Sequence, residues 1–137
     1  MYIQAVKSEI VSHISYFVAA KAEAFVIDPR RDCSIYLEMA QQVGAKITFI
    51  FETHRNEDYV IGSVELAQLS GAKIIHGPGL EWKYGETLVD GSEYKIGSMK
   101  IKAMHTPGHS PASSCYVLYD TETGATPFAV FTGPSLF

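Results

Sequence analysis

The stretch 46–54, KITFIFETH, constrains the fold of this chain more than any other part of the sequence. It is rich in β-branched and aromatic residues, which predicts a buried strand that places His54 at its carboxyl end. Apolar residues at helical spacing precede it over 33–43 and follow it over 59–70, and each run is closed by a glycine. A strand flanked by two helices in this way predicts a sheet with helices on one face.

The elements around this core alternate first and then become antiparallel. Short strands are expected over 2–6, 13–19, 23–28 and 72–76, a hairpin over 92–105 that turns at Gly97-Ser98, and further strands over 113–120 and 127–133. Asp32 is the expected N-cap of the helix over 33–43. Strands and helices mixed in this order predict a fold of the α/β or α+β type.

The composition is that of a folded chain, and its charge excludes some partners. Apolar residues make up 47% and charged residues 19%, which fits a single domain over 1–137. The net charge is −4 with no Lys/Arg cluster, which argues against nucleic acid and against anionic membranes. No apolar run approaches the roughly 20 residues of a spanning helix. Two distant cysteines and no signal-peptide pattern predict a cytoplasmic protein.

Two short segments carry residues that suit metal chemistry. T-H-R-N-E-D-Y, 53–59, lies between a predicted strand and a predicted helix, and H-T-P-G-H-S, 105–110, lies on a Pro-Gly turn between two strands. Ligands at the ends of rigid strands are well placed to hold a metal. We therefore expect His54 and His109 to face one another across one site.

Three motifs in this order resemble those of the metallo-β-lactamase superfamily. That family has an H-x-H-x-D-H loop, a T-P-G-H-T turn and an F-T-G-D segment, which match 54–59, 106–110 and 131–134 here. The flanking text, VIDPRRD, FETHRNEDYVIG and TPGHSPASSCYVLYD, is most similar to the persulfide dioxygenase branch, which is related to glyoxalase II and often fused to rhodanese domains. The resemblance covers nearly the whole chain and implies an αββα sandwich.

The metal-ligand positions of that family are only partly kept. Asn56 and Tyr59 stand at two of the four ligand positions of the loop. In the persulfide dioxygenases one iron is held at the positions of His54, His109 and Pro134. Proline brings no charge and no donor, and a neutral amide oxygen is a poor substitute for imidazole at zinc or iron. The resemblance thus implies a remnant site with two retained metal ligands.

The carboxylates of the loop 54–59 do not restore the family's set of metal ligands. A non-haem iron normally takes two histidines and one carboxylate on one face. Asp58 or Glu57 would complete this set only by leaving the family geometry. Asp58 is the one candidate for a catalytic role, as a carboxylate that orients the His54 imidazole. His105 is expected to end a strand rather than bind metal.

Two interpretations of function follow from the resemblance. In the first, the domain keeps the fold for ligand binding, assembly or regulation, with weak or no catalysis and without iron or zinc at full occupancy. In the alternative, it oxidises a glutathione-type persulfide to sulfite with iron and dioxygen, or hydrolyses a thioester with a zinc-bound water of lowered pKa. A small thiol or persulfide is the implied substrate in the active case.

The resemblance also implies that the domain is longer than this chain. The segment 1–137 would be its N-terminal part, since it ends three residues past Pro134. A sheet built from KITFIFE and PFAVFTG is then expected to leave an apolar face that no second sheet covers, which monomers rarely tolerate. We expect two copies to associate there, or the remainder of a longer protein to cover the face.

Overall fold

The structure is a computed structural model that describes residues 1–8, 13–53, 62–77, 85–105, 114–122, 124 and 127–131. The strands are β1 (Tyr2–Ser8), β2 (His13–Ala20), β3 (Glu23–Ile27), β4 (Lys46–Phe51), β5 (Lys73–His76), β6 (Glu86–Thr87), β7 (Glu93–Ile96), β8 (Met99–His105), β9 (Ser114–Asp120) and β10 (Pro127–Phe131). The helices are α1 (Ser34–Val43) and α2 (Ser63–Ser70). These bounds confirm the predicted strands to within three residues at each end. Among the described strands, β6 alone was not predicted, because two residues are too few to show a pattern.

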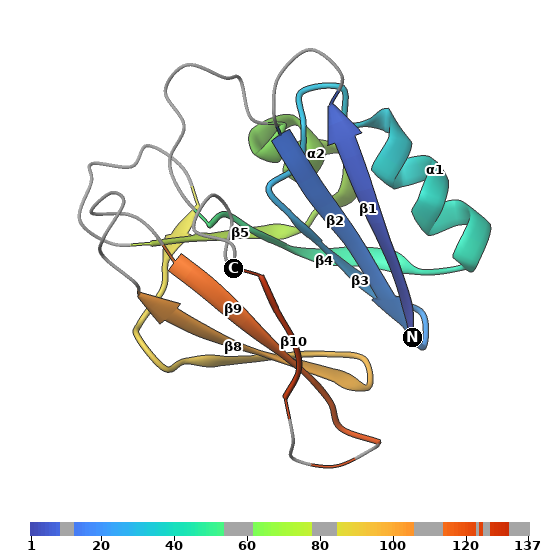
Figure 1. Ribbon diagram of the computed structural model, residues 1–137. Coiled ribbons are helices and arrows are strands. Elements are labelled where there is room, and N and C mark those ends of the chain that lie inside the picture. The colour runs from blue at the N-terminus through green and yellow to red at the C-terminus, as the bar shows by residue number, and fades with distance from the viewer. Residues whose placement is uncertain are drawn as a thin grey trace.

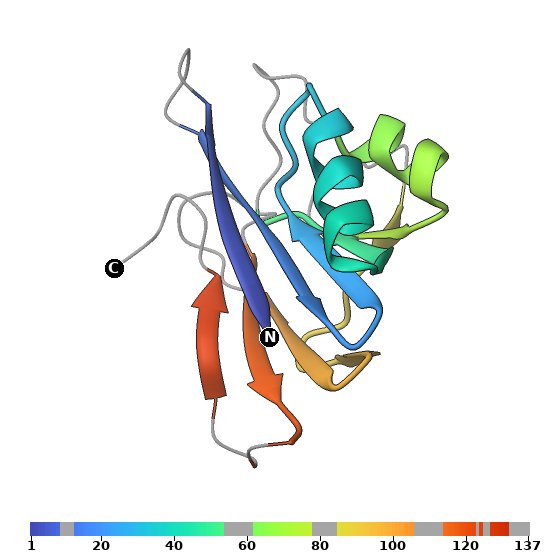
Figure 2. The ribbon, with the colours of Figure 1, turned by 90° about the vertical axis from the view of Figure 1, so that its right-hand side faces the viewer.

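The strands form two sheets that face one another (Figure 1). Sheet A has the order β1-β2-β3-β4-β5-β6, and sheet B has the order β10-β9-β8-β7. In sheet A, β1, β2 and β3 are antiparallel neighbours, whereas β3, β4, β5 and β6 run parallel. Sheet B is antiparallel throughout. Figure 2 shows the helices on one side of sheet A and sheet B on the other. This helix–sheet–sheet arrangement is the expected part of an αββα sandwich.

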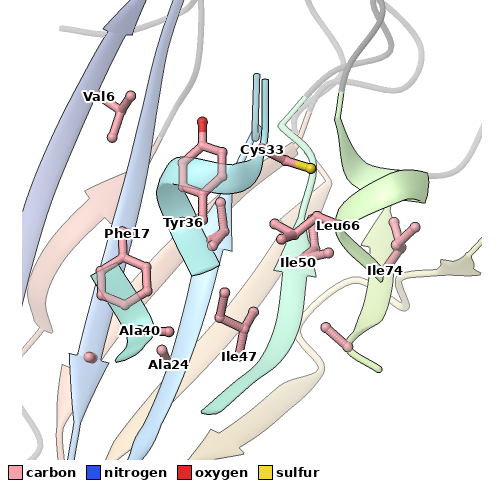
Figure 3. Close-up of a cluster of buried hydrophobic side chains, with 13 residues drawn as sticks. Val6, Phe17, Ala24, Cys33, Tyr36, Ala40, Ile47, Ile50, Leu66 and Ile74 are labelled. Carbon is pink, nitrogen blue, oxygen red and sulfur yellow. The ribbon is translucent and has the colours of Figure 1, made fainter. Parts of the chain in front are cut away.

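The helices pack on the outer face of sheet A, as the pattern predicted (Figure 3). Tyr36 and Ala40 of α1 and Leu66 of α2 are buried there against Phe17 of β2 and Ile50 of β4. Gly44 and Gly71 end the two helices in the left-handed conformation, which glycine adopts without steric cost. Within the described ranges, no helix is long and apolar enough to cross a membrane.

The prediction that Asp32 is the N-cap of α1 was wrong. The N-cap is Cys33, whose side chain makes no capping hydrogen bond. Asp32 lies one residue too early, and its carboxylate accepts a hydrogen bond from the Ser34 hydroxyl at 3.1 Å instead. Cys33 already has helical backbone angles, φ −90° and ψ −2°, so the turn begins before a side chain could cap it.

The expectation of an apolar face without a second sheet was also wrong. KITFIF is β4 of sheet A and PFAVF is β10 of sheet B, so the two segments belong to opposite sheets. A second core fills the space between them, in which Phe51 packs on Phe25 and on Tyr116. The hairpin turn at Gly97 ties the sheets together, because its backbone N–H donates to Glu23 Oε2 at 2.6 Å. The meander therefore folds back under sheet A and covers most of its inner face.

Candidate functional site

Buried polar residues gather where the parallel strands of sheet A end. Asp28 follows β3, Glu52 and Thr53 follow β4, and His76 ends β5, and all four are at most 2% exposed. The carboxyl ends of parallel strands lie at one edge of a sheet, which is the usual place for ligands in α/β folds. The other buried positions within these strands are apolar, so the buried polar groups are concentrated at the edge of the sheet that precedes residues 54–61.

Asp28 fixes the end of β4. Its Oδ1 accepts the backbone N–H of Thr53 at 2.8 Å, and its Oδ2 accepts the Thr53 hydroxyl. The Asp28 backbone N–H in turn donates to the carbonyl of Phe51 at 2.9 Å. Asp28 has φ +49°, a conformation that residues other than glycine seldom adopt. Such a conformation, together with a buried carboxylate, marks a position that the surrounding contacts hold in place.

Pro29, the residue after Asp28, holds Gly62, which follows the segment 54–61. The carbonyl of Pro29 accepts the backbone N–H of Gly62 at 2.9 Å. Gly62 lies so close to this turn that a Cβ there would stand 2.0 Å from the Arg30 carbonyl oxygen. Two successive residues, Asp28 and Pro29, thus hold Thr53 and Gly62, the residues on either side of 54–61.

The residues on either side of the second motif segment, 106–113, are neighbours in sheet B. β8 ends at His105 and β9 begins at Ser114, and these two residues are paired across the strands. The Ser114 backbone N–H donates to the Thr53 carbonyl at 2.6 Å. The described residues next to the segments 54–61 and 106–113 therefore lie beside one another, although about 55 residues separate His54 from His109 in the sequence.

Tyr116 adds a neutral hydrogen-bond donor close to the contact between Ser114 and Thr53. Its hydroxyl donates to the Glu52 carbonyl at 2.6 Å. Burial, and then the carboxylates of Asp28 and Glu52, raise the pKa of this phenol well above its ordinary value. Tyr116 is therefore a structural hydrogen-bond donor at neutral pH and not an acid or base.

Both cysteines have raised pKa values. Burial, followed by the charge of Glu65, raises the pKa of Cys33, although a helix start often lowers it. Burial and then Asp90 raise the pKa of Cys115, which is half-buried on the outer face of sheet B. Neither thiol has the lowered pKa of a nucleophile.

The predicted site residues themselves lie outside the described residues. These are the retained ligands His54 and His109, the carboxylates Glu57 and Asp58, and the substituted positions Asn56, Tyr59 and Pro134. His105 does end β8, as predicted, and its backbone N–H donates to Asp90 Oδ1 at 2.8 Å. Within the ranges that the structure describes, no group of three or more His, Cys, Asp or Glu side chains could hold a metal ion.

Sequence reasoning missed the residues that position the site. Asp28 was treated only as the end of a strand, and Tyr116 was not singled out at all. The signal for Asp28 was present, since a carboxylate directly after an apolar strand and before Pro29 is an unusual end for a buried element. For Tyr116 the alternating pattern of β9 gives no such signal, because any large apolar residue fits it equally well.

Known proteins share this fold and part of this sequence. No protein-family model matches the chain. Hydroxyacylglutathione hydrolases are 35% identical over 91 residues in Rhizobium etli and 36% identical over 97 residues in Brucella anthropi, covering 61% and 69% of this chain. The chain spans only 34% and 35% of the length of these relatives.

Solved structures agree with the sequence relatives. A metallo-β-lactamase from Staphylococcus aureus superposes with a TM-score of 0.87 at 29% identity, over 96% of this chain and 42% of that one. ETHE1 from Myxococcus xanthus superposes with a TM-score of 0.79 at 23% identity, over 86% and 54%, a likeness of fold alone. The chain belongs to the metallo-β-lactamase superfamily. Within it, the sequence relatives are hydroxyacylglutathione hydrolases.

Proposed function

We propose that this chain is a metallo-β-lactamase-type module that keeps the frame of the site, binds a small glutathione-type thiol compound, and has weak or no catalytic activity. The observation that carries the proposal is the hydrogen bond from Ser114 to Thr53, 2.6 Å long. It joins the anchors of the two motif segments, so that a ligand between these segments would contact both. Hydroxyacylglutathione hydrolases among the relatives suggest the ligand class.

The donor set argues for reduced metal binding. Metallo-β-lactamase relatives use zinc or iron, and the sequence keeps His54 and His109 from their ligands. Two imidazoles with Pro134 at the carboxylate position do not fit a catalytic site, which needs at least a third strong ligand. Loss of one ligand commonly lowers metal affinity many-fold. Asp58 stays the candidate to orient His54. A cytoplasmic location belongs to the same proposal.

The alternative is an active iron or zinc enzyme on the same frame. The retained histidines and the identity to hydroxyacylglutathione hydrolases are what favour it. It differs from the first proposal in metal content and in turnover, and not in the ligand class.

Elemental analysis of protein purified without chelators separates the two. We expect far less than one equivalent of iron or zinc per chain, with binding of a hydroxyacylglutathione thioester by calorimetry and no turnover. His54→Ala and His109→Ala should each weaken thioester binding if the segments share a site, whereas the distant Leu69→Ala should not. Stoichiometric metal that both histidine substitutions remove, with thioester hydrolysis or persulfide oxidation, would establish the alternative.

A further inference from the structure

The peptide group between Pro29 and Arg30 is held from both sides. Its carbonyl, that of Pro29, accepts the backbone N–H of Gly62 at 2.9 Å. Its N–H, that of Arg30, donates to the hydroxyl oxygen of Tyr36 at 2.8 Å. Among the described residues no peptide bond is cis, and a trans peptide group is planar, with its N–H and its carbonyl pointing in opposite directions. The direction that Tyr36 gives to the N–H therefore also sets the direction of the carbonyl that Gly62 contacts.

Tyr36 can hold this N–H because its own hydroxyl is held. The ring is fully buried on the outer face of sheet A, and Figure 3 shows its hydroxyl directed away from Phe17 and Ala40. The Tyr36 hydroxyl lies 2.5 Å from the hydroxyl of Ser15 on β2, which is buried as well. The Ser15 hydroxyl in turn donates to the carbonyl of Val6 on β1 at 3.4 Å.

These contacts fix which of the two hydroxyls donates to the other. A hydroxyl group has one proton to donate. Ser15 gives its proton to the Val6 carbonyl, so Tyr36 is the donor in the short contact and the Ser15 oxygen is the acceptor. Burial raises the pKa of the Tyr36 phenol, which therefore keeps this proton at neutral pH. Three hydrogen bonds thus run in one direction, from Arg30 through Tyr36 and Ser15 to β1, and bonds in such a chain strengthen one another.

The Arg30 end of this chain lies directly against the residue that follows the segment 54–61. A Cβ at Gly62 would stand 2.0 Å from the Arg30 carbonyl oxygen and 3.4 Å from the Arg31 Cα. The turn after β3 and the start of α2 are therefore in close backbone contact. A rotation of the peptide group between Pro29 and Arg30 would displace Gly62 or break its hydrogen bond.

We propose that Tyr36 is a positioning residue of the proposed binding site, and that its hydroxyl holds Gly62, and with it the end of the segment 54–61, through the peptide group between Pro29 and Arg30. The inference rests on the proposed function, in which the segment 54–61 contacts the ligand. A phenylalanine ring would fill the same space but would leave the Arg30 N–H without this acceptor. The hydroxyl, and not the ring, carries the role.

Tyr36→Phe in the whole 137-residue protein tests the proposal by two measurements. The first is the backbone amide of Gly62, observed by NMR. Its proton signal should shift upfield and its hydrogen exchange should become about tenfold faster, because its bond to the Pro29 carbonyl weakens. The second is the dissociation constant of a hydroxyacylglutathione thioester, measured by calorimetry. It should rise about threefold or more, because the end of the segment is no longer held in one position.

Ser70→Ala is the matched control. The Ser70 hydroxyl likewise accepts a backbone N–H, that of Ala72 at 3.2 Å, and donates to a carbonyl, that of Leu66 at 2.7 Å. It lies at the opposite end of α2 from Gly62. We expect Ser70→Ala to speed exchange at Ala72 and to leave both the Gly62 amide and the thioester affinity unchanged. If it raised the thioester dissociation constant as much as Tyr36→Phe does, the Tyr36 hydroxyl would contribute only stability and the proposal would be wrong.

The two measurements separate failure of this proposal from failure of the proposed function. If the unmodified protein does not bind the thioester, the proposed function is wrong, and an unchanged Gly62 amide in Tyr36→Phe overturns the positioning role as well. If the unmodified protein binds, the proposal is overturned when Tyr36→Phe changes neither the Gly62 amide nor the dissociation constant, or only one of them. Should Tyr36→Phe not fold, Ser15→Ala removes the acceptor of the Tyr36 proton and should speed exchange at Gly62 about threefold or more. No acceleration in Ser15→Ala would then overturn the proposal.

Discussion

Asp28 and Thr53 are joined twice, through the backbone N–H of Thr53 to Oδ1 at 2.8 Å and through its hydroxyl to Oδ2. One buried carboxylate thus fixes both the backbone and the side chain of the residue before His54. Orientation of a ligand-bearing segment by a hydrogen-bonded neighbour is a common device at protein sites. Here the neighbour comes from the adjacent parallel strand, so the site depends on the register of sheet A.

Replacing Asp28 should destabilise the fold and loosen the start of the 54–61 segment. Asp28→Ala removes both acceptors of Thr53 and places alanine at φ +49°, so we expect a loss of about 2–4 kcal/mol in the free energy of unfolding. Asp28→Asn should cost less than half of this, because asparagine tolerates that conformation and keeps one acceptor. Urea titration measures the stability, and hydrogen exchange measures the Thr53 amide. A change of less than about 0.5 kcal/mol in Asp28→Ala would contradict the role given to this carboxylate.

Gly62 should tolerate no side chain. A Cβ there would stand 2.0 Å from the Arg30 carbonyl oxygen, so Gly62→Ala must move the backbone that Pro29 holds. We expect a cost of about 2 kcal/mol or more in thermal or urea unfolding.

The neighbouring Ser63→Ala is the matched control. Within the described residues, the buried Ser63 hydroxyl oxygen has no hydrogen-bond partner, so its removal should be neutral or stabilising by up to about 1 kcal/mol. If Gly62→Ala and Ser63→Ala changed the free energy of unfolding equally, the close approach of Gly62 to the Arg30 carbonyl would not explain the cost of Gly62→Ala.

The stability of the protein should depend on the Tyr116 proton at high pH. Since folding raises the pKa of this phenol, the unfolded chain releases the proton first as the pH rises. The stabilisation is complete below about pH 10 and declines above it, by up to about 1.4 kcal/mol per pH unit. Tyr116→Phe should lose about 1–2 kcal/mol at pH 7 with the hydrogen bond to Glu52. In urea titrations, the difference in free energy of unfolding between Tyr116→Phe and the unmodified chain should become smaller between about pH 10 and 11. A constant difference would contradict the raised pKa.

Restoring ligands should raise metal affinity if loss of ligands is what weakens it. Pro134→Asp with Asn56→His adds a carboxylate and an imidazole to the retained His54 and His109. We expect iron or zinc affinity to rise by about 10–100-fold, as measured by calorimetry on the folded double variant. Glu86→Gln, at an exposed position of β6, should leave affinity unchanged. No gain would mean that these positions do not converge on one metal in this chain.

The sequence was sufficient for the strands and helices but not for their assignment to layers. The apolar runs of β4 and β10 look alike, and nothing local in either sequence says that they face one another from two sheets. That depends on where the chain turns back, which the contact between Gly97 and Glu23 helps to fix over a long separation.

The motif histidines were visible from the sequence, whereas the residues that anchor their segments were not. His54 and His109 stand in recognisable strings, so a local pattern is enough to find them. Asp28 acts on Thr53 through pairing of β3 with β4, and Tyr116 acts on Glu52 from the other sheet. Such roles arise only after distant strands have met, and residue type alone does not encode them.

Among the strands that the structure describes, none of sheet A pairs with one of sheet B, and this has a consequence for the order of folding. The described strands of sheet A lie between Tyr2 and Thr87, and those of sheet B form a meander from Glu93 to Phe131. Sheet B and the antiparallel part of sheet A consist of pairings between strands near in sequence, which form quickly, whereas the parallel pairings of sheet A close longer loops and form more slowly. The bond from Ser114 to Thr53 joins one sheet to the other and requires both to be in place. In a refolding experiment, the Ser114 amide should therefore gain protection later than the amides within either sheet, and ligand binding should return with that late phase.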